Sequence, residues 1–218
     1  MSDKRPSTLL AWWPNVKELP MKPLAVVVCI AVFAALVARQ DRLPHEEARR
    51  YAKLCVEQLG SLQDAQIVAD VDPDKAVAVR GEGGGAMVVP DKRLSKDKLA
   101  KAGKDVVPVG QVWLRKWTVV AGGKPVAEDK LRVVTINVDD KDRPMPLLLV
   151  GVRKGDKDLE LVAYGKGTEP VLTVPLKPVD FIQESPVELE WQRGEKDADS
   201  LTLTLLGKYQ AVLPVAKQ

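Results

Sequence analysis

Aspartates at alternating positions are the first residues in this chain whose spacing is typical of metal binding. Asp70, Asp72 and Asp74 lie in DVDPDK, and a calcium-binding loop begins with carboxylates at this spacing. The sixth position of such a loop is glycine and the twelfth is glutamate, but Lys75 and Gly81 stand there. Aspartate and proline together are typical of a turn. We therefore predict a turn at this point, and no metal or other cofactor in the protein.

Histidine chemistry depends on His45, because it is the only histidine in the chain. It follows Pro44 at the start of a predicted helix, where we expect a solvated histidine rather than a metal ligand or pH sensor. Nucleophilic catalysis needs a nucleophile beside a positioned base. The serines lack a catalytic motif; those considered are Ser61, Ser95, Ser185 and Ser200. We predict no catalytic residue of this kind, which leaves only Asp/Glu pairs as acid–base groups.

A glycine-rich run, Gly81 to Gly85, has the composition of a phosphate-binding loop. Such a loop continues into Lys-Ser/Thr and a helix. Here GEGGG is followed by AMVV, which has the composition of a strand. The sequence therefore predicts a flexible connection between two strands.

Tryptophans supply the remaining candidate chemistry, as flat apolar platforms for a ligand such as a sugar. Trp113 and Trp117 are four residues apart, which places them on one face of a single predicted strand, and Trp191 lies in a later strand. Packing in the core or at its edge is the commoner role of tryptophan. We keep Trp113 and Trp117 as possible interaction residues.

From Lys75 onward the sequence consists of short segments of strand-forming residues separated by turns. These predicted strands would position the glycine-rich run and the tryptophans. The predicted strands are AVAVR, AMVVP, QVWLRKWTVV, LRVVTINV, PLLLVGVRK, LELVAYG, PVLTVPL, PVELEWQ, SLTLTLL and YQAVLPV. DDKDRP, residues 139–144, is a predicted loop, and LSKDKLAKAG a short surface helix that ends at Gly103. Short loops and one wet face in the clearest strands predict an antiparallel β-sandwich or partly open barrel, the β-domain, over residues 71–218.

Alternation is clearest in VELEWQ, where Trp191 ends a row of apolar residues that should face the core. The polar loop RGEKDAD joins this strand to SLTLTLL, so we expect the indole near Leu201 or Leu203, at the core edge. A two-residue turn, Gly207-Lys208, should join SLTLTLL to YQAVLPV. Glycine at the first position of such a turn is typical of type II′.

A helix is predicted before the strands, in HEEARRYAKLCVEQLG. Its apolar residues recur at three- and four-residue spacing from Ala48 to Leu59, and this face should pack on the β-domain or on a partner. Pro44 suits the first helical turn, and Gly60 suits the end. SLQDAQIVAD should add a second short helix, so residues 41–70 are predicted to be mainly helical.

An apolar run of fifteen residues, Leu24 to Ala38, lies between Lys22 and Arg39. A signal peptide has a short basic start and small residues at its cleavage site, whereas here the preceding segment is long and bulky Leu36 precedes any cut after Ala38. The run covers roughly 22 Å of a hydrocarbon core about 30 Å thick. Lys22 and Arg39 can extend their charges to the two surfaces. We predict that residues 22–40 are retained as a transmembrane anchor.

The segment before the anchor, residues 1–21, is predicted to be a tail whose Trp12 and Trp13 rest at the membrane–water interface. A loose tail without membrane contact is the alternative. Four basic residues precede the apolar run and five follow shortly after it, so this count gives no orientation. A basic N-terminal start usually stays cytoplasmic, which places the β-domain on the periplasmic side of a bacterial-type inner membrane. The cluster of Arg49, Arg50 and Lys53 argues for the reverse.

Net positive charge is concentrated beside the anchor. Residues 1–60 contain nine Lys/Arg and six Asp/Glu, whereas residues 61–218 contain 24 of each. A nucleic-acid-binding domain would carry the excess itself, so we expect no nucleic-acid partner. The excess suits anionic lipid head groups instead.

These features predict a non-catalytic, single-pass, membrane-anchored accessory or scaffold subunit of a membrane or cell-envelope complex. Its expected partners are membrane lipid and other membrane-protein subunits, contacted through the β-domain. The alternative is a module that binds an envelope polymer or small ligand through Trp113 and Trp117. An enzyme with a carboxylate-based site is the third hypothesis.

Overall fold

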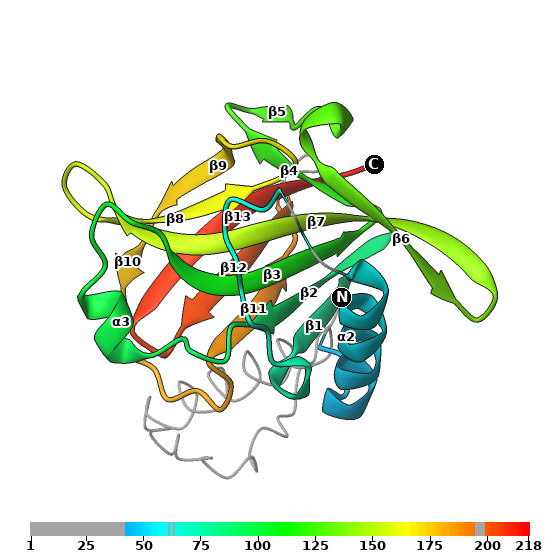
Figure 1. Cartoon of the computed structure of the whole chain (residues 1–218), viewed down its shortest axis with the longest axis horizontal. Coiled ribbons are helices and arrows are strands. Elements are labelled where there is room, and N and C mark those ends of the chain that lie inside the picture. Colours follow the sequence, from blue (N-terminus) through cyan, green and yellow to red (C-terminus); the bar gives the residue numbers. More distant parts are fainter. Residues whose placement is uncertain (1–41, 61, 63, 195–198) are drawn as a thin grey trace, which may run out of the picture. The chain divides into compact units, whose positions relative to one another are not determined.

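The strands of this chain form two antiparallel sheets that pack face to face as an open sandwich (Figure 1), which confirms the mainly β prediction. The computed structural model describes residues 42–60, 62, 64–194 and 199–218. In this part of the chain no helix is both long and apolar enough to cross a membrane. The predicted tail and anchor lie outside the described residues, and with them Trp12, Trp13, Lys22, Leu24, Ala38 and Arg39.

Sheet one has seven strands in the order β1-β2-β3-β7-β8-β9, with β6 also paired to β7. The bounds are β1 Val77–Gly81, β2 Gly84–Pro90, β3 Val107–Arg115, β6 Arg132–Val138, β7 Lys141–Lys154, β8 Leu159–Tyr164 and β9 Pro170–Pro175. The long strand β7 pairs with β6 through its first half and with β3 and β8 through its second half. The β6–β7 hairpin therefore extends beyond the rest of the sheet (Figure 1).

Sheet two has six strands in the order β11-β12-β13-β4-β5, with β10 also paired to β13. The bounds are β4 Trp117–Ala121, β5 Lys124–Pro125, β10 Lys177–Pro178, β11 Val187–Gln192, β12 Asp199–Leu205 and β13 Tyr209–Lys217. The register pairs Trp191 with Leu201, one of the two neighbours that the sequence predicts, and Leu189 with Leu203. Trp191 is half-buried and packs against the core, which confirms its expected place at the core edge.

The chain passes from sheet one to sheet two at Lys116, where the sequence predicts one continuous strand. Lys116 has a φ of 57°, in the left-handed region that a strand cannot contain. Trp113 therefore lies in β3 and Trp117 in β4, in different sheets. The prediction that these tryptophans share one face of one strand is wrong, because spacing by four residues implies a common face only in an uninterrupted strand.

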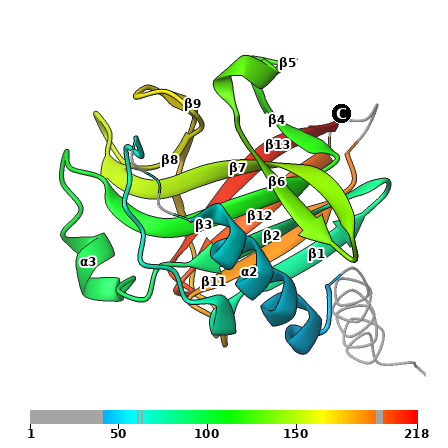
Figure 2. The ribbon, with the colours of Figure 1, turned by 45° about the vertical axis from the view of Figure 1, so that its right-hand side comes forward.

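Sheet one has buried residues on both faces. In β7, Leu148 and Val150 belong to the core between the sheets, whereas Leu147 and Leu149 belong to the cluster on the outer face. Helix α2, His45–Leu59, covers part of this outer face and lies against β1 and β2 (Figure 2). Both ends of α2 are where the sequence places them, and its apolar side packs on the β-domain.

Small residues let α2 approach the sheet closely. Ala48, Ala52 and Cys55 are its buried residues. At its C-terminal end the helix is attached to β6, because the Gln58 side-chain amide donates to the Asn137 carbonyl at 3.1 Å and accepts from its N–H at 2.7 Å.

The predicted second helix in residues 61–70 is wrong, because the described residues of this segment contain no helix. Buried Asp91 holds the end of the segment against the sheet instead, accepting a hydrogen bond from the backbone N–H of Asp70 at 2.8 Å. The Lys92 N–H in turn donates to the Asp70 carbonyl at 2.8 Å. The remaining helices are short: η1 Pro73–Lys75, α3 Lys96–Ala100 within the predicted surface helix, and η2 Glu128–Lys130.

Two turns differ from their predicted form. Strand β7 begins at Lys141, inside the predicted loop at 139–144, because Asp139 and Asp140 alone turn the chain with φ values of 51° and 59°. The last hairpin is present, but three residues separate the paired Leu205 and Tyr209, so the predicted two-residue turn Gly207-Lys208 is wrong. The Lys208 N–H donates to the Leu205 carbonyl, and the central residues of this turn, Leu206 and Gly207, have positive φ angles. Positive φ at both central residues is the type I′ pattern, so the predicted type II′ turn is wrong.

Candidate functional site

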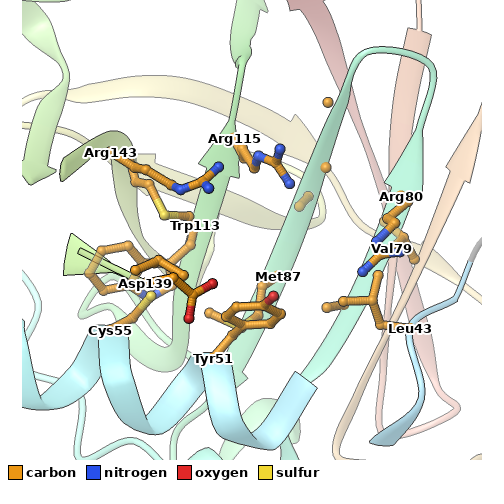
Figure 3. A pocket seen from close by; sticks show the side chains of 16 residues that line it. Leu43, Tyr51, Cys55, Val79, Arg80, Met87, Trp113, Arg115, Asp139 and Arg143 are labelled. Atoms are coloured by element: carbon orange, nitrogen blue, oxygen red, sulfur yellow. The ribbon is translucent and has the colours of Figure 1, made fainter. Parts of the chain in front are cut away.

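A cleft opens on the outer face of sheet one, beside α2 (Figure 3). Its volume is about 190 Å³. The lining residues come from α2, from β1, β2 and β3, from the β6–β7 hairpin, and from Leu43, which precedes the helix. Its lining combines an apolar surface with several arginines.

The register of the three strands explains why the sheet is hollow at this point. Arg80 of β1 pairs with Gly85 of β2, and Gly85 pairs in turn with Arg115 of β3. This row therefore has no side chain at its centre and a guanidinium at each end. The next row, Ala78-Met87-Trp113, supplies an apolar floor.

The β6–β7 hairpin contributes a third arginine to the rim. Figure 3 shows Arg143 and Arg115 extending over the cleft from their strands, with Tyr51 of α2 on the opposite side. Asp139, at the turn of the hairpin, is the acidic residue of the lining. The rim thus carries more positive than negative charge.

The arginines differ in how the protein neutralises them. Arg80 donates to the Glu47 carboxylate of α2 at 2.6 Å, which attaches the helix to β1. Among the described residues, neither Arg115 nor Arg143 forms an ion pair or a side-chain hydrogen bond, and the Nε of Arg143 is buried without a partner. Two guanidinium groups therefore remain available to an anion.

Cys55 and Trp113 form the inner wall of the cleft. Burial raises the pKa of the Cys55 thiol to about 12, so the thiol is protonated at neutral pH and is not a nucleophile. Trp113 is fully buried, and its indole N–H donates to the Gln111 side chain at 3.1 Å. Trp113 thus lies within the wall of the cleft and does not present the exposed flat face that a ligand platform needs.

Trp117 belongs to sheet two, and its side chain lies in the core between the two sheets. Its ring stacks on Trp191 with centroids 6.2 Å apart and planes 17° from parallel. A Cβ atom added to Gly81 or Gly84 would overlap these indoles. The glycine-rich run is therefore a paired, tightly turned hairpin rather than a flexible connection, and it needs glycine because tryptophan rings pack directly against its backbone.

The other candidate residues have structural positions. Asp72 caps η1 by accepting from the Asp74 N–H at 3.1 Å, and Asp74 contacts Lys53 at 3.0 Å, which confirms a turn in DVDPDK. His45 is exposed in the first turn of α2. The described residues contain no group of three His, Cys, Asp or Glu side chains placed to hold a metal ion.

Comparisons of this chain with protein-family models, with curated proteins and with solved structures gave no match. Functional proposals therefore depend on the geometry. Sequence reasoning missed Arg80, Arg115 and Arg143 as neighbours. One signal was present: Arg80 and Arg115 each lie two residues after an outward-facing apolar residue at the end of a strand.

Proposed function

We propose that this protein is a non-catalytic accessory or scaffold subunit of a membrane or cell-envelope complex. In this proposal residues 22–40 anchor the chain, and the sandwich presents a fixed face to other subunits on the periplasmic side. The supporting observation is the attachment of Arg42, the first described residue, to the sandwich.

Arg42 and Leu43 connect the N-terminal end of the described chain to both sheets. The Arg42 guanidinium contacts the Glu188 carboxylate of β11 at 2.7 Å, and its backbone bridges to Val79 of β1. The Leu43 N–H donates to the Ala78 carbonyl of β1 at 2.9 Å. Arg42 and Leu43, which follow the predicted anchor almost directly, are therefore bound to the β-domain.

Only a few residues separate the predicted anchor from the attachment at Arg42, which limits how far the β-domain can lie from the membrane. From Ala38 to Arg42 the backbone can extend by at most about 14 Å. An anchor that ends at Arg39 would hold the sandwich close to the bilayer surface, without a long tether. A fixed height suits a subunit that docks on a neighbour in the same membrane better than one that searches for distant ligands.

The first test is the state of the N-terminus in native membranes. The proposal requires that the full chain stays in the membrane after an alkaline wash and that its intact mass includes residues 1–40. A mature N-terminus near Arg39 would overturn the anchor. Native mass spectrometry in mild detergent should then show a second protein bound; a strictly solitary chain would contradict the accessory role.

A small-ligand module is the second candidate function. It is favoured by the cleft, whose rim of arginines above an apolar floor is typical of a binding site rather than a packing interface.

A further inference from the structure

In the row Arg80-Gly85-Arg115, Arg80 attaches α2 through Glu47, whereas Arg115 forms no ion pair or side-chain hydrogen bond among the described residues. Each residue of the row is at the outer face of paired strands, and a larger residue than Gly85 would fill the hollow with packed atoms. Arg115 and Arg143 line one cleft together with Asp139, and neither arginine forms an ion pair among the described residues. Arg115 is exposed to solvent, whereas the Nε of Arg143 is buried without a partner. With Arg80 paired to Glu47, the lining retains two cationic side chains, Arg115 and Arg143, and one carboxylate, Asp139, so a bound anion would balance the remaining positive charge.

The chemistry of the lining defines the ligand. Guanidinium groups bind carboxylates through paired hydrogen bonds, so Arg115 and Arg143 specify an anionic group at the rim. Ala78, Met87 and Trp113 specify an apolar body below it. Methionine in particular adapts to flexible apolar chains.

We propose that this cleft binds a single-chain anionic amphiphile, an acyl chain that ends in a carboxylate. The carboxylate lies between Arg115 and Arg143, and the chain runs over Met87 toward Leu43. The choice of an acyl chain rests on the proposed membrane function, because Leu43 directly follows the segment that would emerge from the bilayer. Arg80 is engaged by Glu47 and borders the site without holding the anion.

Photo-crosslinking tests this proposal on the full chain in phosphatidylcholine nanodiscs. The probe is decanoate with a diazirine near its methyl end, and labelled peptides are mapped by mass spectrometry. We expect labelling of the β2 and β7 peptides that contain Met87 and Met145. Unlabelled decanoate should compete, and uncharged decanol should compete at least tenfold less well.

The rim arginines are tested by the double variant Arg115→Gln/Arg143→Gln, which should lose at least tenfold of the cleft labelling. Arg153→Gln is the matched control, because it removes one charge at the far end of β7, where Arg153 pairs with Glu160. Circular dichroism of each variant establishes that the sandwich is folded. If the double variant is unfolded, the single variant Arg115→Gln replaces it, with the same direction of effect.

Three results would overturn the inference: unchanged labelling in the folded variant, equal competition by decanol, or labelling confined to residues 1–41. The intact mass of the same sample reports separately on the anchor. A retained N-terminus without cleft labelling refutes the ligand alone, whereas a cleaved N-terminus refutes the proposed function.

Discussion

The two faces of sheet one consist of alternate residues of the same strands, but the inner face is fully packed and the outer face is partly open. On the inner face, Val77, Val79 and Leu114 meet sheet two in a closed core. On the outer face, some residues of these strands are covered by α2, and others line an open cleft. Packing determines the inner residues, because an unfilled space there would cost stability directly. The outer face contains an unfilled cleft with charged side chains in its lining. Because packing does not explain such a cleft, we expect a function there.

The inner face is broken most severely by Trp117→Ala. Trp117 is fully buried between the sheets, and truncating such a residue typically costs about 3–5 kcal/mol, a large share of a domain's roughly 5–15 kcal/mol. Its stacking partner Trp191 is half-buried, so Trp191→Ala should cost clearly less. Chemical denaturation of both variants measures the difference. Equal costs would mean that the ring of Trp191 is as enclosed as that of Trp117.

Adding volume on the same face should have the next largest effect. A methyl group at Gly84 overlaps the indole of Trp117, so Gly84→Ala should destabilise the protein by about 1–3 kcal/mol through overpacking. Gly103→Ala is the matched control, because its new methyl group meets no atom within 4 Å. A Gly84→Ala variant as stable as the control would show that the hairpin does not pack on the stack as described.

The attachment of Arg42 to Glu188 joins the N-terminal end to sheet two and should contribute less. The ion pair is short, but the Arg42 side chain is 41% exposed, so solvent screening limits its contribution to about 0.2–1 kcal/mol. A double-mutant cycle with Arg42→Gln and Glu188→Gln isolates this contribution. The exposed pair Lys208–Asp180 is the reference and should give a smaller coupling energy than Arg42–Glu188. A larger coupling at the reference pair would contradict a special role for Arg42.

The smallest effect concerns Asp74, which attaches the turn at η1 to α2. Its hydrogen bond and ion pair with Lys53, and the charge of Arg49, lower its pKa below the ordinary value of 3.8. A carboxylate with a lowered folded-state pKa stabilises the protein above its unfolded pKa, and this contribution is lost as pH falls through the folded pKa. Thermal melts of the wild type and of Asp74→Asn should therefore differ slightly near neutrality and converge in acid. A constant difference across this range would contradict the linkage.

The sequence predicts the elements well and their mutual positions poorly. Alternation located the longer strands of both sheets but not the two-residue strands β5 and β10, and the row ending at Trp191 predicted Leu201 as one of two neighbours. Helix α2 was found from its periodicity and its flanking Pro44 and Gly60. These features are local, so a single stretch of residues contains them.

The misses are non-local. Nothing in the sequence of β3 and β4 shows that Lys116 adopts positive φ and divides QVWLRKWTVV, predicted as one strand, between two sheets. The cleft depends on a row across three strands, Arg80-Gly85-Arg115, and its members are brought together only by pairing register. The glycine-rich run was misread for the same reason, since the tryptophans that require it lie far away in sequence.

The thiol of Cys55 has a practical consequence. It is held between α2 and sheet one, where it is protonated and sterically covered. A thiol-specific reagent can approach it through the cleft or when the helix moves away from the sheet, so the labelling rate of the Cys55 peptide measures access to the outer layer. The labelling rate measured with and without an added amphiphile would show whether a ligand in the neighbouring cleft protects Cys55 or makes it more accessible.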